Sequence, residues 1–238
     1  IHANREAMTA CLADANDAGA ESLVFHGDLV GYGPDPVWVV ERVAALVGDG
    51  ALAIQGNHDA AAAAEADTLA PLARRAMAWP RERLDAQHRA FLASLPLDLH
   101  EDDRLYVHGS ASAPEDWIYL LGPREAYHCF RATAQRVTFC GHTHVPALFN
   151  ESATSLPQRH VPVDGQPMSL LAQRRWIAVL GAVGQPRDRN PAACYGLFET
   201  PSNRLSYVRV PYDVDLTARK IVAHGLPEAL ARRLVTGR

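Results

Sequence analysis

The sequence predicts a mixed α/β fold in which two mixed β-sheets pack face to face with helices outside. Strand-like apolar runs alternate with helical patterns in the first half, and a series of alternating runs fills the second half. No shift in composition marks a linker. With 238 residues the chain is long enough for a sizeable core, so we expect one domain over residues 1–238.

Two helices and two strands are expected near the start of the chain. Gly19 is well placed to end the first helix, and Asp35 followed by Pro36 is a typical start for the second. The short apolar runs between them are typical of buried strands that crossover helices join in parallel. The expected ranges are helices over 4–18 and 35–47 and strands over 22–25 and 51–54.

The middle of the chain is predicted to be helical up to a hairpin. Pro80 is expected to start a helix that reaches Ala93, and the alanine run 60–64 is expected to be helical filler. The acidic segment 101–103 separates the two hairpin strands. The other expected elements are hairpin strands over 97–100 and 104–107, a helix over 123–135 and a strand over 137–140.

Alternating runs in the last third predict a second, largely antiparallel sheet, and two short helices close the chain. The expected strands are 145–149, 159–163, 175–180, 195–199 and 205–210, and the expected helices are 215–223 and 227–235.

The composition excludes several classes of protein. The net charge of -4 gives no basic footprint for nucleic acid or an anionic membrane. No apolar run approaches the roughly 20 residues of a membrane span. The cysteines form no CxxC pair, so a reducing, cytoplasmic setting is expected rather than a disulfide framework. They are Cys11, Cys129, Cys140 and Cys194.

Ligand-type side chains follow the predicted strands, each beside a glycine. Strand ends in α/β folds meet in one crevice, so these side chains are expected to converge. Their mixed nitrogen and oxygen donors suit manganese, iron, nickel or zinc, and the lack of thiolates argues against a structural zinc site. The glycines would keep side chains away from the metals and the substrate. The clusters are Gly27-Asp28, Gly56-Asn57-His58-Asp59, His108-Gly109 and Gly141-His142-Thr143-His144.

Each cluster taken alone has a plainer interpretation. A Gly-Asp pair is commonly a turn, the GNHD segment is compatible with an Asx turn, and His108 is compatible with an ordinary strand end. The clusters occur jointly, in order and each at a strand end, which favours a metal site.

The series resembles the calcineurin-like metallophosphoesterases, which show D-x-H, GD, GNH(D/E), H and GHxH in this order. Residues 1–4 (Ile-His-Ala-Asn) look like the tail of the opening D-x-H-x-N segment. Residues 27–34 and 184–188 look like the small bacterial and archaeal branch related to the cyclic-phosphodiesterase type. The resemblance spans roughly residues 1 to 200 and implies a four-layer αββα sandwich. It also places a further Asp ligand and its strand upstream of Ile1, so we expect this chain to be part of a longer protein.

The resemblance implies two adjacent divalent metal ions, with manganese favoured. One would be held by His2, Asp28 and His144. The other would share Asp28 and add Asn57, His108 and His142. The metals would share a water, lower its pKa and direct the hydroxide at phosphorus.

Three residues are expected to assist the metals. His58 is the candidate donor to the leaving oxygen, because it lies beside Asn57 without being needed as a ligand. Asp59 is expected either to orient His58 or to cap a helix. Arg187 is expected either to grip the phosphate or to form a surface salt bridge.

The expected activity is hydrolysis of small or cyclic phosphodiesters. Phosphoprotein phosphatases carry Asp-Arg where this chain has Gly31-Tyr32, which argues against that class and against dinucleoside-tetraphosphate enzymes. The alternatives are a phosphomonoesterase or protein phosphatase of the same superfamily, and a catalytically silent homologue that binds nucleotides. The expected partner is a small phosphate ester. Trp117 and Tyr119 are candidates to stack a base, although packing is the commoner role of such residues. The sequence leaves the oligomeric state open.

Overall fold

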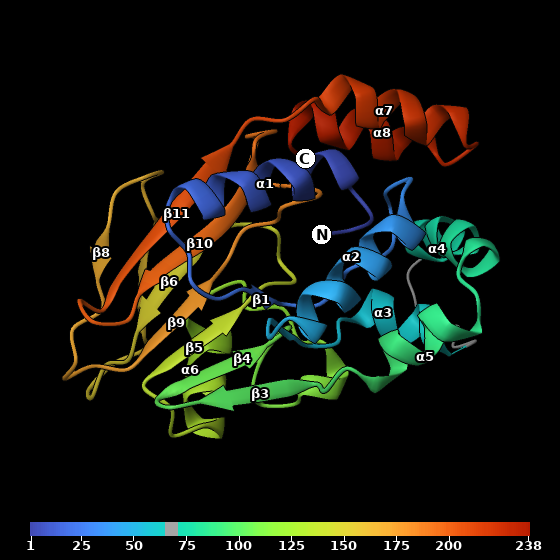
Figure 1. The fold of residues 1–238 in the computed structure, drawn as a ribbon. Coiled ribbons are helices and arrows are strands. Elements are labelled where there is room, and N and C mark those ends of the chain that lie inside the picture. Colours follow the sequence, from blue (N-terminus) through green and yellow to red (C-terminus); the bar gives the residue numbers. More distant parts are fainter. Residues whose placement is uncertain (65–70) are drawn as a thin grey trace.

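The computed structural model describes residues 1–64 and 71–238, which form three β-sheets with helices on the outside (Figure 1). The strands are β1 (Val24–Phe25), β2 (Leu52–Ala53), β3 (Asp98–Glu101), β4 (Arg104–Val107), β5 (Val137–Cys140), β6 (Ala147–Asn150), β7 (Gln158–His160), β8 (Met168–Ser169), β9 (Trp176–Val179), β10 (Ala193–Glu199) and β11 (Arg204–Val210). The helices are α1 (Arg5–Asp17), α2 (Pro36–Gly48), α3 (Asn57–Ala63), α4 (Pro71–Arg83), α5 (Ala86–Ser94), the 3₁₀ turn η1 (Pro114–Asp116), α6 (Pro123–Ala132), α7 (Val214–Ala223) and α8 (Glu228–Thr236).

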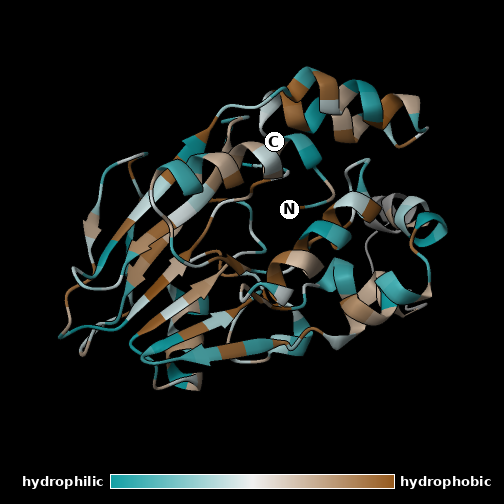
Figure 2. Cartoon of the chain, viewed as in Figure 1, coloured by the Kyte–Doolittle hydropathy of each residue, from teal (hydrophilic) through white to brown (hydrophobic). Residues whose placement is uncertain are grey.

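The largest sheet has six strands in the order β3-β4-β5-β9-β6-β7. Strands β4, β5 and β9 run parallel, and antiparallel strands complete the sheet on both sides. The central strands β5 and β9 are buried along their whole length, whereas the edge strands β3 and β7 are largely exposed. Figure 2 shows the same contrast, with hydrophobic residues in β9 and mostly hydrophilic ones in β3. A strand buried on both faces loses the alternation of hydropathy that marks a surface strand.

A second layer covers one face of this sheet. It consists of the parallel pair β1-β2 and the antiparallel sheet β10-β11-β8. One hydrophobic cluster joins Val24 of β1, Leu52 of β2 and Tyr207 of β11 to the six-stranded sheet, which contributes Tyr106 and Phe139. A groove of about 660 Å³, lined by residues of both β1 and β10, separates the two parts of the second layer. Packing on the large sheet therefore holds the two parts beside each other.

Helices cover the outer faces of both layers. Ala126 and Phe130 of α6 pack against Phe149 and Ile177 on the far side of the six-stranded sheet. Helix α1 lies along β10 and β11 (Figure 1), and α2 packs against the β1-β2 pair. The layers follow the order helix, sheet, sheet, helix. The predicted mixed α/β class is confirmed.

The predicted division of the strands between two sheets was partly wrong. Strands β6, β7 and β9 belong to the same sheet as β3 to β5, and only β10 and β11, with the unpredicted β8, form a separate antiparallel sheet. The reason is that β9 pairs in parallel with β5 on one side and antiparallel with β6 on the other. Alternation of side chains does not show which sheet a strand joins.

The helix expected to start at Pro80 was also placed wrongly. Helix α4 contains Pro80 within its range, and the next helix starts at Ala86, where Asp85 caps it by accepting a hydrogen bond from the His88 N–H. The alanine run lies in α3, which begins earlier than expected, at Asn57. Asp35 precedes α2 as predicted, but its side chain makes no capping hydrogen bond and pairs with Lys220 of α7 instead.

None of the helices in the described parts of the chain combines the length and hydropathy that a membrane crossing requires.

Tyr207 offers a test of how the two layers are joined. Its buried hydroxyl donates a 2.9 Å hydrogen bond to the Ala147 carbonyl of β6. Tyr207→Phe should lower the free energy of unfolding by about 1 kcal/mol, because that carbonyl loses a buried donor. Urea denaturation measures the change, and Tyr127→Phe, at a tyrosine that is 46% exposed, is the matched control. Equal stability of Tyr207→Phe and wild type would contradict a role for the hydroxyl.

Candidate metal centre

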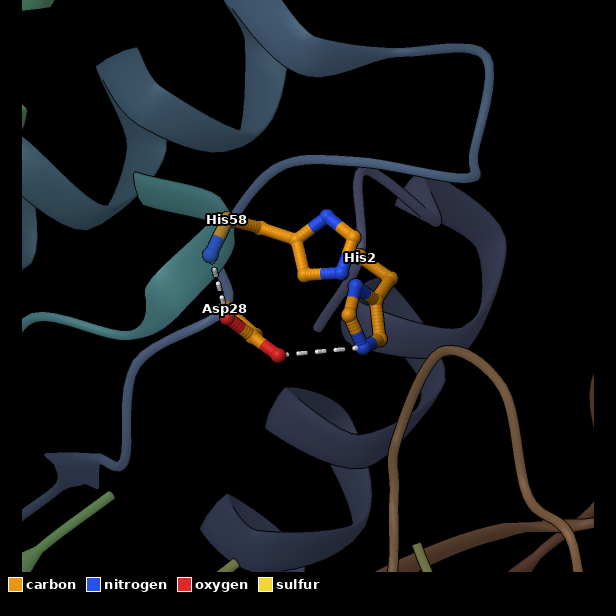
Figure 3. A group of neighbouring side chains, drawn as sticks. All are labelled: His2, Asp28 and His58. Atoms are coloured by element: carbon orange, nitrogen blue, oxygen red, sulfur yellow. Dashed lines mark hydrogen bonds and ion pairs between the residues drawn. The ribbon is translucent and has the colours of Figure 1, made fainter. Parts of the chain in front are cut away.

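Asp28 lies at the centre of the predicted ligands. It follows β1, and its Oδ1 accepts a 3.0 Å hydrogen bond from the backbone N–H of His58. Its Oδ2 lies 3.2 Å from His108 Nε2 and 3.5 Å from His2 Nε2. Figure 3 shows Asp28, His2 and His58 turned toward one another from three separate segments of the chain. One carboxylate thus faces histidines on both sides.

Three of the predicted histidine ligands are held by main-chain carbonyls. The Nδ1 atom of His2 lies 3.2 Å from the Val30 carbonyl oxygen. His108 and His144 make the same kind of contact, at 2.6 Å to the His26 carbonyl and at 2.7 Å to the Gln185 carbonyl. A carbonyl only accepts, so each Nδ1 carries a proton. The Nε2 atoms of His2 and His144 then present lone pairs, whereas His108 Nε2 can donate to Asp28 as long as no metal ion is bound. This tethering is typical of histidines that bind metal ions.

The ring nitrogens of these ligands lie close together in pairs. His2 Nε2 lies 2.9 Å from His144 Nε2, and His108 Nε2 lies 3.0 Å from His142 Nδ1. Burial lowers the pKa of His2 and of His144 well below the usual value, so no proton is available to bridge them at neutral pH. Two lone pairs at this distance repel unless a cation lies between them. The donor set therefore fits a metal ion.

Asn57 supplies an oxygen that is also available to a metal ion. Its Oδ1 atom is buried and has no hydrogen-bond partner within residues 1–64 and 71–238, and a buried acceptor of this kind is costly unless it binds something. Within the described residues, two groups of side chains have ligand atoms within 4.8 Å of one another, and both contain Asp28. They are His2, Asp28 and His58, and Asp28, His108 and His142.

The charges at the site favour cation binding. Burial would raise the pKa of Asp28, but His108 and His58 hold it well below the usual range, so the carboxylate is ionised. Asp28 in turn raises the pKa of His108 against the effect of burial. Burial and the neighbouring His108 lower the pKa of His142 to about 4, which leaves that ring neutral as a ligand.

The glycines near the ligands were predicted to leave room for metals and substrate. In the structure, three of them are needed for close contacts within the protein itself. A Cβ on Gly56 would overlap the Asp28 backbone, and a Cβ on Gly27 would overlap the backbone of Gly56. A Cβ on Gly31 would overlap the His58 ring. Gly27 and Gly56 thus allow their two loops to contact each other, and Gly31 allows the His58 ring to lie against its backbone. Gly141 has only one atom near such a Cβ, 3.9 Å away, and is not needed for this reason.

Asp59 holds these two loops together. Its Oδ1 accepts from the N–H groups of Leu29 and Val30 at 2.9 and 3.2 Å, and its Oδ2 accepts from Gly56 N–H at 3.0 Å. Burial and the charge of Asp28 raise the pKa of Asp59 to about 7, although the N–H donors of Gly56 and Val30 oppose this. Within the described residues its side chain bonds only to main-chain N–H groups, so the structure favours the capping role over the orientation of His58.

His58 faces the site without a hydrogen bond on Nδ1. Its ring is 3% exposed, lies 5.0 Å from the His2 ring and 4.5 Å from the Tyr32 ring, and Nδ1 is buried without a partner in the described structure. Burial lowers its pKa. Neutral His58 at this place can exchange a proton or a hydrogen bond with a bound molecule.

Arg187 and Tyr32 form one side of the site. The guanidinium carbon of Arg187 lies 5.7 Å from the centroid of the Tyr32 ring, and its Nη2 donates to Gln185 Oε1 at 3.2 Å. Its Nε is buried without a partner, and no ion pair to Arg187 occurs in residues 1–64 or 71–238. The predicted surface salt bridge is therefore not the arrangement seen. Tyr32 was not predicted as a neighbour of the site, although it occupies the place where phosphatases carry Asp-Arg.

Two aromatic side chains contact the ligands His108 and His142. Tyr119 stacks on His142, with ring centroids 3.9 Å apart and an interplanar angle of 16°, and Trp117 meets His108 edge-on. His26 was predicted to be a surface or packing residue; its ring lies near Tyr106 and Phe139, and its carbonyl holds His108. A main-chain contact of this kind leaves no signal in the sequence.

Known proteins resemble this chain in sequence. Residues 1–203 match the calcineurin-like phosphoesterase superfamily domain. An uncharacterised protein of Methanocaldococcus jannaschii is 32% identical over 244 aligned residues, which cover 100% of this chain and 96% of the relative.

Solved structures show the same fold. A metallophosphoesterase from Sphaerobacter thermophilus is 38% identical with a TM-score of 0.90, over 100% of this chain and 96% of that one. A hypothetical protein from Pyrococcus horikoshii is 19% identical with a TM-score of 0.80 over the same shares, and it is similar in fold. A putative diadenosine tetraphosphatase is also similar in fold, at 15% identity and a TM-score of 0.53 over 89% of this chain and 90% of that one.

The structural role of Asp59 can be tested by removing its carboxylate. Asp59→Ala leaves three buried N–H groups without their acceptor, and each costs about 1–3 kcal/mol. We expect thermal unfolding in the presence of a chelator to show a large loss of stability. Asp116→Ala, at an exposed carboxylate, is the control. A variant at position 59 that melts like wild type would contradict the bracing role.

Stability of the metal-free protein should depend on pH through His26. Burial and His108 lower the pKa of this ring from 6.5 to about 4. The unfolded chain binds the proton first as the pH falls, so the free energy of unfolding decreases between pH 6.5 and 4. The contribution of His26 is on the order of 3 kcal/mol. Denaturation with a chelator at several pH values should give a flatter dependence for His26→Leu than for wild type or for His128→Leu, at an exposed histidine. Equal slopes would show that His26 is not held neutral.

Proposed function

Because the chain belongs to the calcineurin-like phosphoesterase superfamily and is a metal-dependent phosphoester hydrolase, we propose that it is a phosphodiesterase that uses two divalent metal ions. The observation that carries this proposal is the arrangement around Asp28: its Oδ2 lies 3.2 Å from His108 Nε2 and 3.5 Å from His2 Nε2, and the buried Asn57 Oδ1 has no hydrogen-bond partner among the described residues. Such an arrangement has two sets of donors that share one bridging ligand.

The ligands divide between the two sides of Asp28. His2 and His144 would hold one ion with Asp28, and their Nε2 atoms are already in contact. Asn57, His108 and His142 would hold the second. The mixed imidazole and oxygen donors favour manganese among the candidates, which also include iron, nickel and zinc. When bound, two such ions neutralise phosphate oxygens and activate a water for attack on phosphorus.

His58 is the proposed donor to the leaving oxygen. It approaches the site from the first turn of α3, and its buried ring is not needed to complete either ligand set. A neutral imidazole with a low pKa can place its N–H on the leaving oxygen as negative charge develops there. This role needs one ring nitrogen that is free to bind the substrate. His58 Nδ1 makes no hydrogen bond to the described residues and meets that need.

Arg187 is the proposed anchor for a phosphate oxygen. Its guanidinium is the cationic group on the Tyr32 side, and the unpaired Nε is available to donate. Its main chain is fixed to the site, because Arg187 N–H donates to the His144 carbonyl at 3.1 Å. An arginine positioned in this way suits the tetrahedral oxygens of a phosphoryl group.

The proposed preference for diesters rests on Gly31, the residue that lies against the His58 ring. Gly31 lies against the imidazole where phosphatases place the Asp of Asp-Arg, so the ring is not driven toward the charged form that a dianionic monoester favours. A monoesterase or protein phosphatase is the runner-up within the same family. A catalytically silent nucleotide-binding protein is the alternative from another class. We further propose a small phosphate ester as partner and a cytoplasmic setting, which the four buried, unpaired cysteines favour.

A panel of esters with manganese tests these proposals. Bis(p-nitrophenyl) phosphate and cyclic nucleotides should be hydrolysed faster than p-nitrophenyl phosphate. Asp28→Asn should lose both bound metal and activity, because the shared carboxylate is removed. His58→Gln should keep its metal and lose about 10²–10⁴-fold in kcat, whereas His128→Gln should behave as wild type.

Three results would contradict the proposal in different ways. Faster turnover of the monoester would favour the runner-up activity. Metal-loaded protein that binds nucleotides but hydrolyses none of these esters would favour the silent alternative. Loss of metal in His58→Gln would make His58 a ligand, which its place in the first ligand group allows.

A further inference from the structure

The loop between β4 and α6 brings apolar side chains to the metal centre. Tyr119 covers one face of the His142 ring, and Trp117 lies edge-on to His108 at a centroid distance of 5.8 Å. Tyr119 is nevertheless 43% exposed, and Leu121 beyond it is 69% exposed. Ile118 is 39% exposed. We call Ile118, Tyr119 and Leu121 the apolar wall.

The apolar wall is held in a fixed shape. Leu120, between Tyr119 and Leu121, is 3% exposed and packs in the core beneath α6. On the other side of Tyr119, the Ile118 carbonyl accepts a 3.1 Å hydrogen bond from Ser110 N–H. A Cβ on Gly109 would lie 2.8 Å from that same carbonyl, so the loop closes only over a glycine. The exposed surface is therefore preformed, and a ligand would not have to order it.

A cationic side chain, Arg187, also lies beside the metal ligands. Arg187 lies there against Tyr32, and the Tyr119 hydroxyl is close enough to contribute to the raised pKa of Tyr32, which burial mainly causes. The metal ligands thus have both an exposed aromatic surface and a cationic side chain beside them: Tyr119 stacks on His142, and Arg187 N–H donates to the His144 carbonyl. A phosphate ester has an organic end and an anionic end, which these two features match.

We propose that the apolar wall binds the organic group of the substrate and that the preferred esters carry a planar aromatic group. Tyr119 offers its ring for stacking or edge contact, and Ile118 and Leu121 extend the apolar surface beside it. This inference rests on the proposed function, because the metal ions fix where the phosphorus lies. It adds the class of substrate, which separates aryl and nucleoside esters from alkyl and sugar esters.

Binding of phosphonates tests the proposal without turnover. Methylphosphonate and phenylphosphonate share the same anionic group and differ in the ring. Calorimetry on the full chain loaded with manganese should show phenylphosphonate binding about tenfold more tightly. Adenosine 5′-monophosphate against ribose 5-phosphate gives a second pair, in which a sugar carries the ring. A preference in the first pair alone indicates aryl esters, and a preference in the second pair indicates nucleoside esters.

Variants of the wall connect this preference to Tyr119. In Tyr119→Ala the ratio between the two phosphonates should fall to about one, while the affinity for methylphosphonate and the metal content stay unchanged. Tyr119→Phe should keep the ratio, and Tyr127→Ala, at an exposed tyrosine of α6, should not alter it. If Tyr119→Ala loses metal because His142 is disturbed, Leu121→Ser decides, with an expected reduction of about threefold.

Two outcomes would overturn the inference. Equal binding of the two phosphonates by wild type, together with equal binding of the two 5′-phosphates, would show that the wall does not select the organic group. An unchanged ratio in both Tyr119→Ala and Leu121→Ser would place the selectivity elsewhere. Failure of every phosphonate and phosphate to bind the metal-loaded chain would instead refute the proposed function itself.

Discussion

Main-chain carbonyls that hold imidazole rings around one carboxylate are the constraint on which the rest of the structure depends. The rings of His2 and His108 turn their Nε2 atoms toward Asp28, and His144 turns its Nε2 toward His2, only if the carbonyls behind them are in place. Those carbonyls belong to loops from distant parts of the chain. The fold must therefore bring the segment after β1 against the loops that follow β4, β5 and β9.

This constraint explains why backbone meets backbone so closely near the ligands. The Gly27 and Gly56 loops touch without room for a side chain, and Asp59 ties them with three hydrogen bonds. The same close packing places Gly31, which has no side chain, against the His58 ring. A residue that looks catalytic by position, such as Asp59, is then needed to keep the loops together.

The ligand clusters were predictable because each follows a strand, and the ends of parallel strands meet at one edge of a sheet. The short apolar runs gave the strands themselves. The assignment of strands to sheets was not predictable, since β9 is buried on both faces and its pattern is the same whichever neighbours it has. The direction of a side chain is also a tertiary property. Asp35 has the sequence of a helix cap, yet it pairs with Lys220, which is 185 residues away in the sequence. Tyr32 and the His26 carbonyl reach the site for reasons that no local pattern contains.

Four of the ligand residues have left-handed backbones: φ is 54° at His2, 50° at Asp28, 64° at His142 and 61° at His144. Residues with a Cβ adopt this region at an energetic cost of order 1–3 kcal/mol each. Bonds to a cation would offset that strain, so coordination would serve the conformation of these loops as well as the reaction. A cell short of the ion would then lose folded protein along with turnover, and the abundance of this hydrolase would follow the supply of its metal.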